Sequence, residues 1–238
     1  MTAAAGHTAD TQRAPPETAL RVAGSEPLAR HWFERSPEDL ARALLGRLVV
    51  RDDAGQRRVG RIVETEAYAG EHDRASHARA GRTRRTEPMY GPAGHAYVYL
   101  VYGMHHCLNV VGEIDGRPGA VLIRALEPVE GVSSMRLARP TTQAPDARLL
   151  AGPGLLCAGM SIDRRFDGRD LTLPGLLWIA DDPAPDELQP TAVVTGPRIG
   201  VAYAGPVWAG RSWRFGRADS TSLSRPFPAR ARATDPTT

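Results

Sequence analysis

Residues 61–77 read RIVETEAYAGEHDRASH and combine a strand pattern with a cluster of reactive side chains. The segment opens with β-branched residues, which favour a β-strand. Side chains repeat every second residue in a strand, so Glu64, Glu66 and Tyr68 should point to one face. This stretch therefore predicts a strand that carries two carboxylates and a phenol on the same side.

The segment after the strand adds imidazole groups. Gly70 should end the strand, and the following loop carries His72 and His77. A carboxylate, a phenol and an imidazole in one short segment suit general acid–base catalysis on a flat ligand. The alternative is that glutamates at a strand end are solvated surface residues, and the stretch alone leaves both interpretations open.

Composition indicates a soluble globular protein. The chain has 238 residues, enough for a substantial core, with 42% hydrophobic and 24% charged residues. No apolar run approaches the ~18 residues of a membrane-spanning helix, and the N-terminus lacks the apolar region of a signal peptide. We therefore expect a cytoplasmic protein without a membrane partner. Cys107 and Cys157 are too few for a disulfide framework.

All 30 basic Lys and Arg residues are arginine. A Schiff-base nucleophile is an amine, so a mechanism that depends on a lysine side chain is excluded. The net charge of +3 and the pI near 9.2 permit a polyanionic partner without identifying one.

The pattern of elements predicts one α+β domain. We expect disordered tails at residues 1–25 and 226–238 and a single domain at 26–225, with a first helix capped by Ser36 and begun by Pro37. The expected strands and hairpins are 47–51 with 58–67, 96–111, 120–128, 169–180, 191–204 and 213–215, and two short helical pieces lie within 145–162.

The segment 96–111 predicts a hairpin with an aromatic residue at its tip. Tyr97 and Tyr99 share one face, and Tyr102 stands just before the turn. A large exposed ring at a tip does little for stability but suits a wedge between stacked bases. For Tyr97 we favour core packing; for Tyr99 and Tyr102 the pattern leaves packing and function open.

Two groups of arginines are candidates for binding anions. Arg124 lies within an apolar strand, where its charge needs a partner such as Glu66 or a phosphate. The loop after Tyr68 is dense in arginine and could bind phosphates, or could be a solvated basic loop. The arginines of this loop are Arg74, Arg79, Arg82, Arg84 and Arg85.

An acid–base cluster beside an aromatic tip in a basic chain fits an enzyme that takes a base out of a nucleic acid helix. The chain also resembles the 3-methyladenine (alkyladenine) DNA glycosylases over residues 29–217. The motifs that carry the resemblance are RIVETEAY, His77, YVYLVYGM with HHCLNV, LIRALEP and PRIGVAYAG.

The resemblance implies a curved, barrel-like antiparallel sheet with surrounding helices and a protruding hairpin. It also implies a monofunctional enzyme of base excision repair that hydrolyses the N-glycosidic bond of damaged purines in double-stranded DNA. We expect a cytoplasmic, nucleoid-associated monomer that needs no cofactor and no metal.

Residue roles follow from the same resemblance. Glu66 matches the general base that activates water, and Arg124 and the Val201 carbonyl match groups that hold this water. Tyr102 matches the residue that replaces the flipped nucleotide. The residues that match the base pocket are Tyr68, Ala75, His77, Tyr99 and Asn109, with Asn109 placed to discriminate against the 2-amino group of guanine.

The residues themselves agree with this reaction and mark two departures from the family. A positioned base contributes ~10²–10⁴-fold, and the lack of lysine predicts an abasic product without strand cleavage. His105 and His106 follow the hairpin turn where aromatics are common in the family. Ala202 and Tyr203 replace a Gly-His type pair, which puts the substrate range in doubt.

Two other classes remain as alternatives. A metal-dependent hydrolase could use Glu66, His72, His77 and His105 or His106, although no recognised ligand spacing is present. A non-catalytic nucleic-acid-binding module would use the same surface without chemistry.

Overall fold

The computed structural model describes residues 26–53, 55–140, 142–182 and 193–228. They form one α+β domain built on an eight-stranded sheet in which all strand pairs are antiparallel. The strands are β1 (Leu48–Asp53), β2 (Gln56–Ala69), β3 (Ala96–Val101), β4 (His105–Val111), β5 (Gly119–Glu130), β6 (Leu177–Ala180), β7 (Val193–Gly196) and β8 (Arg214–Arg217). The predicted tails fall largely outside the described residues.

Strand β2 is the centre of the sheet. One edge pairs with β5 along almost its whole length, from Val59 to Ala69. The other edge pairs first with β1 and then, at Glu64–Glu66, with β8. Irregular pairing with β5 around Glu64 adds local bending at this branch. The branch point therefore coincides with the two glutamates predicted to matter.

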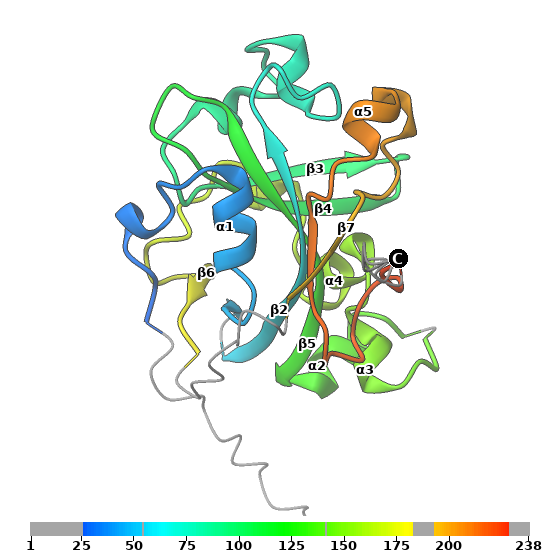
Figure 1. Ribbon diagram of the computed structural model, residues 1–238. Coiled ribbons are helices and arrows are strands. Elements are labelled where there is room, and N and C mark those ends of the chain that lie inside the picture. The colour runs from blue at the N-terminus through cyan, green and yellow to red at the C-terminus, as the bar shows by residue number, and fades with distance from the viewer. Residues whose placement is uncertain (1–25, 54, 141, 183–192, 229–238) are drawn as a thin grey trace, which may run out of the picture.

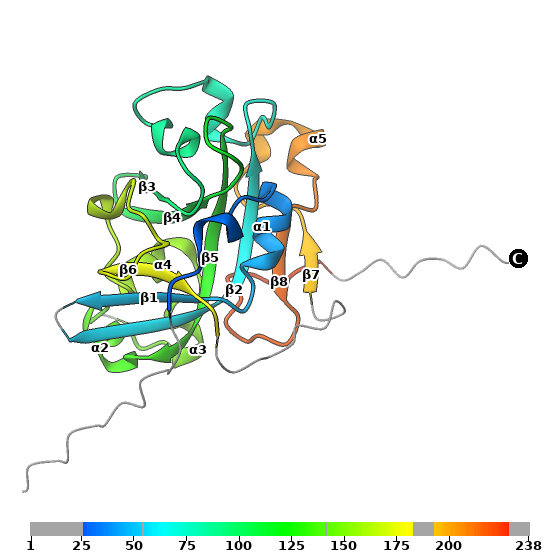
Figure 2. The same cartoon turned by 90° about the vertical axis from the view of Figure 1, so that its left-hand side faces the viewer.

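The sheet is strongly curved but does not close. Its main path runs β3-β4-β5-β2-β1-β6, with β8 and β7 branching from β2. Strands β3 and β4 run across the upper part of β2 and β5 (Figure 1), whereas β1 and β6 extend across the lower part (Figure 2). The predicted curved antiparallel sheet is confirmed as an open sheet, with the β3–β4 hairpin at one end.

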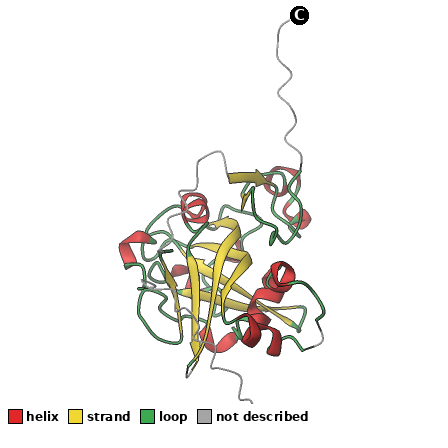
Figure 3. Ribbon diagram, turned by 90° about the horizontal axis from the view of Figure 1, so that it is seen from below, coloured by secondary structure: helices red, strands yellow, loops and turns green. Residues whose placement is uncertain are grey.

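Short helices surround the strands when the molecule is seen from below (Figure 3). Helix α1 (Pro37–Ala43) packs on β2 and β5, and α4 (Pro153–Gly159) packs on β4 and β5. The remaining α-helices are α2 (Val132–Leu137), α3 (Asp146–Leu149) and α5 (Pro206–Ala209). None of the helices in the described ranges is long and apolar enough to cross a membrane.

Helix α1 begins as the sequence predicts. The Ser36 hydroxyl accepts a hydrogen bond from the backbone N–H of Asp39 at 3.2 Å, and Pro37 occupies the first helical position. Leu40 and Leu44 are fully buried in the main core. The apolar side of this helix thereby holds the lower half of β2 in place.

Five 3₁₀ turns complete the described secondary structure: η1 (Arg30–Trp32), η2 (His77–Ala80), η3 (Glu87–Tyr90), η4 (Arg164–Phe166) and η6 (Ala202–Ala204). Turns η2 and η3 form the loop region above the hairpin, next to α5 (Figure 1). These loops bring segments from both halves of the chain to the end of β2 where Tyr68 lies.

Two predicted strands are shorter than expected. Of residues 169–180 only Leu177–Ala180 is a strand, because Pro174-Gly175 bends the chain before it. Of residues 191–204 only Val193–Gly196 is a strand among those described, since Pro197 follows it and Gly200 takes a φ of 78°. The predicted strand at Trp213–Phe215 is found slightly later, as β8.

Candidate active site

A cavity of about 520 Å³ opens between the end of β2, the β3–β4 hairpin and the loops that carry η2 and η6. Every residue predicted for the base pocket lines it, and so do Arg124, Val201 and Tyr102. The structure therefore brings together residues from five separate segments that the sequence pattern or the family resemblance marked individually.

Glu66 lies directly behind the wall of this cavity and is fully buried. Its Oε2 accepts a hydrogen bond from the Tyr68 hydroxyl at 2.8 Å, and its Oε1 accepts one from the Ile199 backbone N–H at 2.7 Å. Arg124 Nη1 lies 3.2 Å from the same Oε1. Because these three partners line the cavity themselves, the carboxylate is one layer away from any bound ring.

The predicted face of β2 is confirmed in detail. Glu64, Glu66 and Arg124 form one buried group, with Arg124 Nε 2.9 Å from Glu64 Oε1. Burial lowers the pKa of Arg124, but the neighbouring Glu66 and Glu64 charges raise it overall. The buried arginine thus has the carboxylate partner that its apolar strand required.

Tyrosine and histidine rings form the walls of the cavity. The His77 and Tyr99 ring centroids are 4.6 Å apart with planes at 71°, and the Tyr97 and Tyr99 centroids are 5.3 Å apart. Tyr97 is 2% exposed and packs in a small core cluster, as predicted, while its ring also borders the cavity. Burial raises the pKa of Tyr68 and Tyr99 well above the usual value, so both stay neutral phenols.

His77 is held in its neutral form. Its Nδ1 lies 2.9 Å from the Tyr97 hydroxyl. Burial, together with the nearby Arg85 and Arg79 charges, lowers the pKa of His77 to about 4. At neutral pH the cavity wall therefore presents an uncharged imidazole, which does not repel a positively charged ring.

Asn109 and Val201 are fixed by the backbone. The Asn109 amide nitrogen donates to the Tyr97 carbonyl at 2.9 Å, and Asn109 is 3% exposed. The Val201 carbonyl accepts from the Ala204 N–H at 2.9 Å, which leaves a second lone pair. These hydrogen bonds therefore fix the orientation of the Asn109 amide and of the Val201 carbonyl at the cavity wall.

The hairpin tip carries the exposed ring that the sequence predicts. Tyr102 is 88% exposed and has a positive φ of 52°, a conformation that non-glycine residues rarely adopt. Met104 beyond the turn is 71% exposed. The tip thus presents apolar surface at the cavity rim, which is the placement expected of a wedge.

An ion pair that the sequence did not reveal ties the loops together. Arg198 and Asp73 are fully buried, with Nη1 2.5 Å from Oδ2. Arg198 also donates to the Ala67 carbonyl at 2.9 Å, and its guanidinium lies 4.8 Å from the centre of the Tyr68 ring. This pair holds the end of β2 against the loop that carries Ile199. The signal for it was only that Arg198 belongs to a motif shared with the resembling family.

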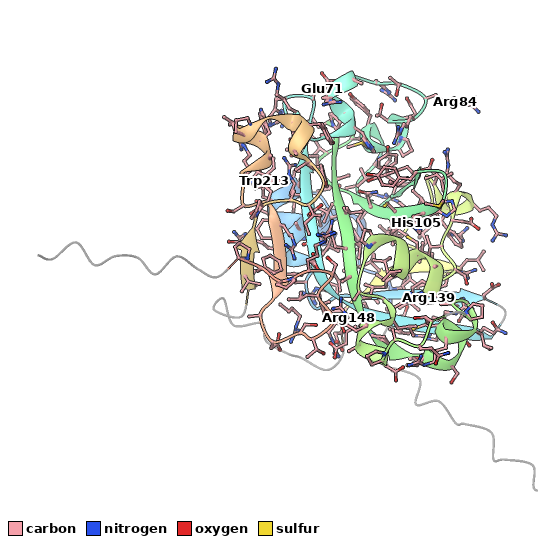
Figure 4. The ribbon with its side chains drawn as sticks, turned by 90° about the vertical axis from the view of Figure 1, so that its right-hand side faces the viewer. Glu71, Arg84, His105, Arg139, Arg148 and Trp213 are labelled. Carbon is pink, nitrogen blue, oxygen red and sulfur yellow. The ribbon has the colours of Figure 1, made fainter. Side chains whose placement is uncertain are left out.

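The basic loop divides into distinct roles. Arg82 is paired with Glu87 at 2.7 Å, whereas Arg85 lies 5.6 Å from the Tyr99 ring centre and borders the cavity. Arg74 and Arg84 are exposed. Figure 4 shows Glu71 and Arg84 on this loop beyond the hairpin that carries His105, with Arg139 and Arg148 at the other end of the molecule. Of the arginines in this loop, Arg85 therefore lies at the cavity itself.

The structure separates His72 from the predicted cluster. Its ring centroid lies 5.8 Å from that of Trp208, and it lines a neighbouring groove instead. Across the described ranges, no group of three or more His, Cys, Asp and Glu side chains could hold a metal ion. The ligand set considered for a metal-dependent hydrolase is therefore not assembled in this part of the chain.

The fold and the site define a cavity with aromatic walls next to a buried carboxylate. Residues 31–221 match the family model described as methylpurine-DNA glycosylase. The chain belongs to this family, and it is a DNA glycosylase, an N-glycosyl hydrolase of DNA repair that acts on alkylated bases.

Curated relatives match this chain in sequence over most of their length. A protein of Anaeromyxobacter dehalogenans strain 2CP-C is 52% identical over 203 residues, covering 84% of this chain and 88% of its own. One of Myxococcus xanthus strain DK1622 is 48% identical, covering 86% and 97%. One of Legionella pneumophila strain Paris is 43% identical, covering 83% and 98%. All three are provisionally named 3-methyladenine DNA glycosylases.

Proposed function

We propose that the protein is a monofunctional 3-methyladenine-type DNA glycosylase that flips damaged purines out of duplex DNA. It hydrolyses the N-glycosidic bond with water and leaves an abasic site. The observation that carries the proposal is the buried Glu66 behind a cavity of aromatic rings. The names of the relatives support the substrate class.

The carboxylate has the properties of a general base. Its two oxygens offer about four acceptor sites, and the contacts from Tyr68, Ile199 and Arg124 use three of them. The remaining capacity suits a water, with the Val201 carbonyl as a second acceptor for it. Proton transfer to Glu66 would let this water attack the anomeric carbon as the bond to the base breaks.

The walls and the rim supply binding. Tyr68, His77 and Tyr99 would sandwich the flipped base, with ~1–3 kcal/mol per stacked ring. Neutral His77 tolerates the positive charge of an alkylated purine, which is already a good leaving group. Tyr102 would fill the space left in the helix, and Asn109 would reject a 2-amino group. Stacking and filling together offset the few kcal/mol that flipping costs.

Exposed arginines near the cavity mouth would bind the DNA backbone. We propose that the enzyme works as a cytoplasmic, nucleoid-associated monomer without a metal or cofactor. The chain has no lysine, so no side-chain amine is present to cleave the abasic strand.

The test is release of free base from duplex oligonucleotides that each carry one damaged purine, with and without a chelator. The panel contains 3-methyladenine, 7-methylguanine, hypoxanthine and ethenoadenine. We expect release that is unaffected by the chelator and that leaves an unbroken abasic strand. Tight DNA binding without release from any lesion would contradict the proposal, and loss of activity with chelator that zinc restores would indicate a metal-dependent hydrolase.

A further inference from the structure

Tyr203 stands on the rim of the cavity, in the turn η6. Its side chain is 60% exposed, and it lines both the 520 Å³ cavity and an open neighbouring groove. A ring shared by a cavity and a groove forms part of the boundary between them. Tyr203 is thus placed to contact the edge of a ring bound in the cavity.

The Tyr203 hydroxyl has a defined partner. It donates a hydrogen bond to the Ala75 carbonyl at 2.9 Å, and Ala75 is 2% exposed and lines the same cavity. The guanidinium of Arg79 lies 5.0 Å from the centre of the Tyr203 ring. Arg79 in turn donates to the Arg74 carbonyl at 3.0 Å. The phenol is therefore held across two loops that are 128 residues apart in the sequence.

This contact changes what the cavity edge offers to a ligand. A backbone carbonyl only accepts hydrogen bonds, whereas a hydroxyl both donates and accepts. Burial raises the pKa of Tyr203, so the hydroxyl keeps its proton. With Tyr203 in place, the cavity edge at Ala75 presents the phenolic O–H of Tyr203 next to the Ala75 carbonyl oxygen. Without the hydroxyl it would present the bare carbonyl.

Ala75 lies two residues before His77 and lines the same cavity, so a base packed on His77 would have the Ala75 carbonyl within reach of its edge. With its glycosidic bond next to Glu66, a purine turns the edge that carries the 6-substituent away from Glu66. A 6-oxo group facing the Ala75 carbonyl would place acceptor against acceptor. A 6-amino group would donate to that carbonyl directly.

We propose that Tyr203 determines specificity and favours 6-oxo purines over 6-amino purines in this cavity. The inference rests on the proposed function. The phenolic hydrogen lies between two acceptors when a 6-oxo base is bound, which removes their repulsion. A 6-amino group gains nothing comparable from the hydroxyl, because the Ala75 carbonyl alone already accepts from it, so the hydroxyl shifts selectivity toward 6-oxo bases.

The experiment uses methylated duplex DNA, which contains 3-methyladenine and 7-methylguanine in the same molecules. Both damaged bases are cationic, but the first carries a 6-amino group and the second a 6-oxo group. The two released bases are quantified under single-turnover conditions for the wild type and for Tyr203→Phe. We expect the ratio of 7-methylguanine to 3-methyladenine to fall about tenfold in the variant, the equivalent of one hydrogen bond. 7-Methylguanine also carries a 2-amino group, but its effect is the same in the wild type and in Tyr203→Phe. It therefore cancels when the ratios of the two proteins are compared.

Two further variants keep the test sharp. Tyr90→Phe removes a phenol that donates to Glu71 at 2.7 Å and does not line the cavity, and it should keep the wild-type ratio. Tyr203→Leu removes the ring as well and should shift the ratio as Tyr203→Phe does. An unchanged ratio in Tyr203→Phe, or a shift only in Tyr203→Leu, would overturn the role of the hydroxyl. Failure of the wild type to release either base would instead overturn the proposed function, and the inference with it.

Discussion

Strand β2 carries two buried glutamates that differ in their hydrogen-bond partners. Glu64 accepts from Arg124 and Arg214 and from the backbone and hydroxyl of Ser224, at 2.6–2.9 Å. Glu66, two residues on, accepts from groups that line the cavity. Arg124 touches both carboxylates. One glutamate is thus enclosed by protein on every side, and the other lies behind the wall of the cavity.

The C-terminal segment explains the enclosure. Arg214 donates to the Arg225 carbonyl at 2.5 Å and lies 3.9 Å from the centre of the Phe227 ring. This segment covers the part of the β2 face around Glu64 (the covered side), while the part around Glu66 borders the cavity (the open side). From this difference we expect identical side chains on one strand to serve stability on the covered side and chemistry on the open side.

The largest expected effect is on the open side. Glu66→Gln keeps the size of the side chain but removes the general base, so base release should fall ~10²–10⁴-fold. Single-turnover assays measure this loss, and binding to lesion-containing duplex should stay near the wild-type level. Base release at the wild-type rate would show that Glu66 is not the general base. Glu64 and Glu66 would then not differ in function.

Glu64→Gln should lower the stability of the fold. The change leaves Arg124 and Arg214 buried without their shared counter-charge, which costs ~3–5 kcal/mol of the free energy of unfolding. Urea denaturation of both glutamine variants measures the difference. A Glu64→Gln protein that unfolds at the wild-type urea concentration would contradict the assignment of Glu64 to stability.

Ser224→Ala probes the contact between the covered side and the C-terminal segment. The variant loses the 2.7 Å hydroxyl contact to Glu64 and the 3.3 Å contact from Arg124 to the same hydroxyl, but it keeps the backbone N–H contact to Glu64 at 2.6 Å. We expect a loss of ~1.5–3 kcal/mol in the free energy of unfolding, the value of one hydrogen bond to a charged group. Ser220→Ala is the matched control, because its hydroxyl accepts from Ser222 instead. Equal stability of the two variants would argue against the role of Ser224.

The sequence predicts the open side better than the covered side. The two-residue period of a strand placed Glu66 and Tyr68 together, and the cost of a buried charge required an anionic partner for Arg124, with Glu66 or a phosphate as candidates. Hairpin geometry placed Tyr102 at the tip. Each of these inferences uses only local pattern or a general energetic rule.

The contacts that the sequence did not predict join distant segments. Ile199 meets Glu66 across 133 residues, Asp73 meets Arg198 across 125, and Ser224 meets Glu64 across 160. No local period encodes such pairs, because the curvature of the sheet and the paths of the loops set them. The branching of β2 between β1 and β8 is likewise a property of the packed sheet.

The smallest effect concerns the pH dependence of stability on the open side. The pKa of His77 is about 4 in the folded protein, below its usual 6.5, because of burial and then Arg85 and Arg79. As pH falls below 6.5, the unfolded chain takes up a proton that the folded protein does not bind. The contribution to stability is therefore complete above pH 6.5 and is lost as pH falls toward 4.

The wild type should accordingly lose ~1 kcal/mol more than His77→Gln between pH 7.5 and pH 5, after allowance for solvent screening at this half-buried ring. Urea denaturation at both pH values measures the difference. His31→Gln is the control, because His31 is exposed, and it should follow the wild type. If His77→Gln lost as much stability as the wild type, His77 would titrate normally, and the cavity wall would become charged on mild acidification. In the proposed function a neutral His77 leaves room for a cationic base against this wall. A charged His77 would therefore argue against a cavity suited to a cation.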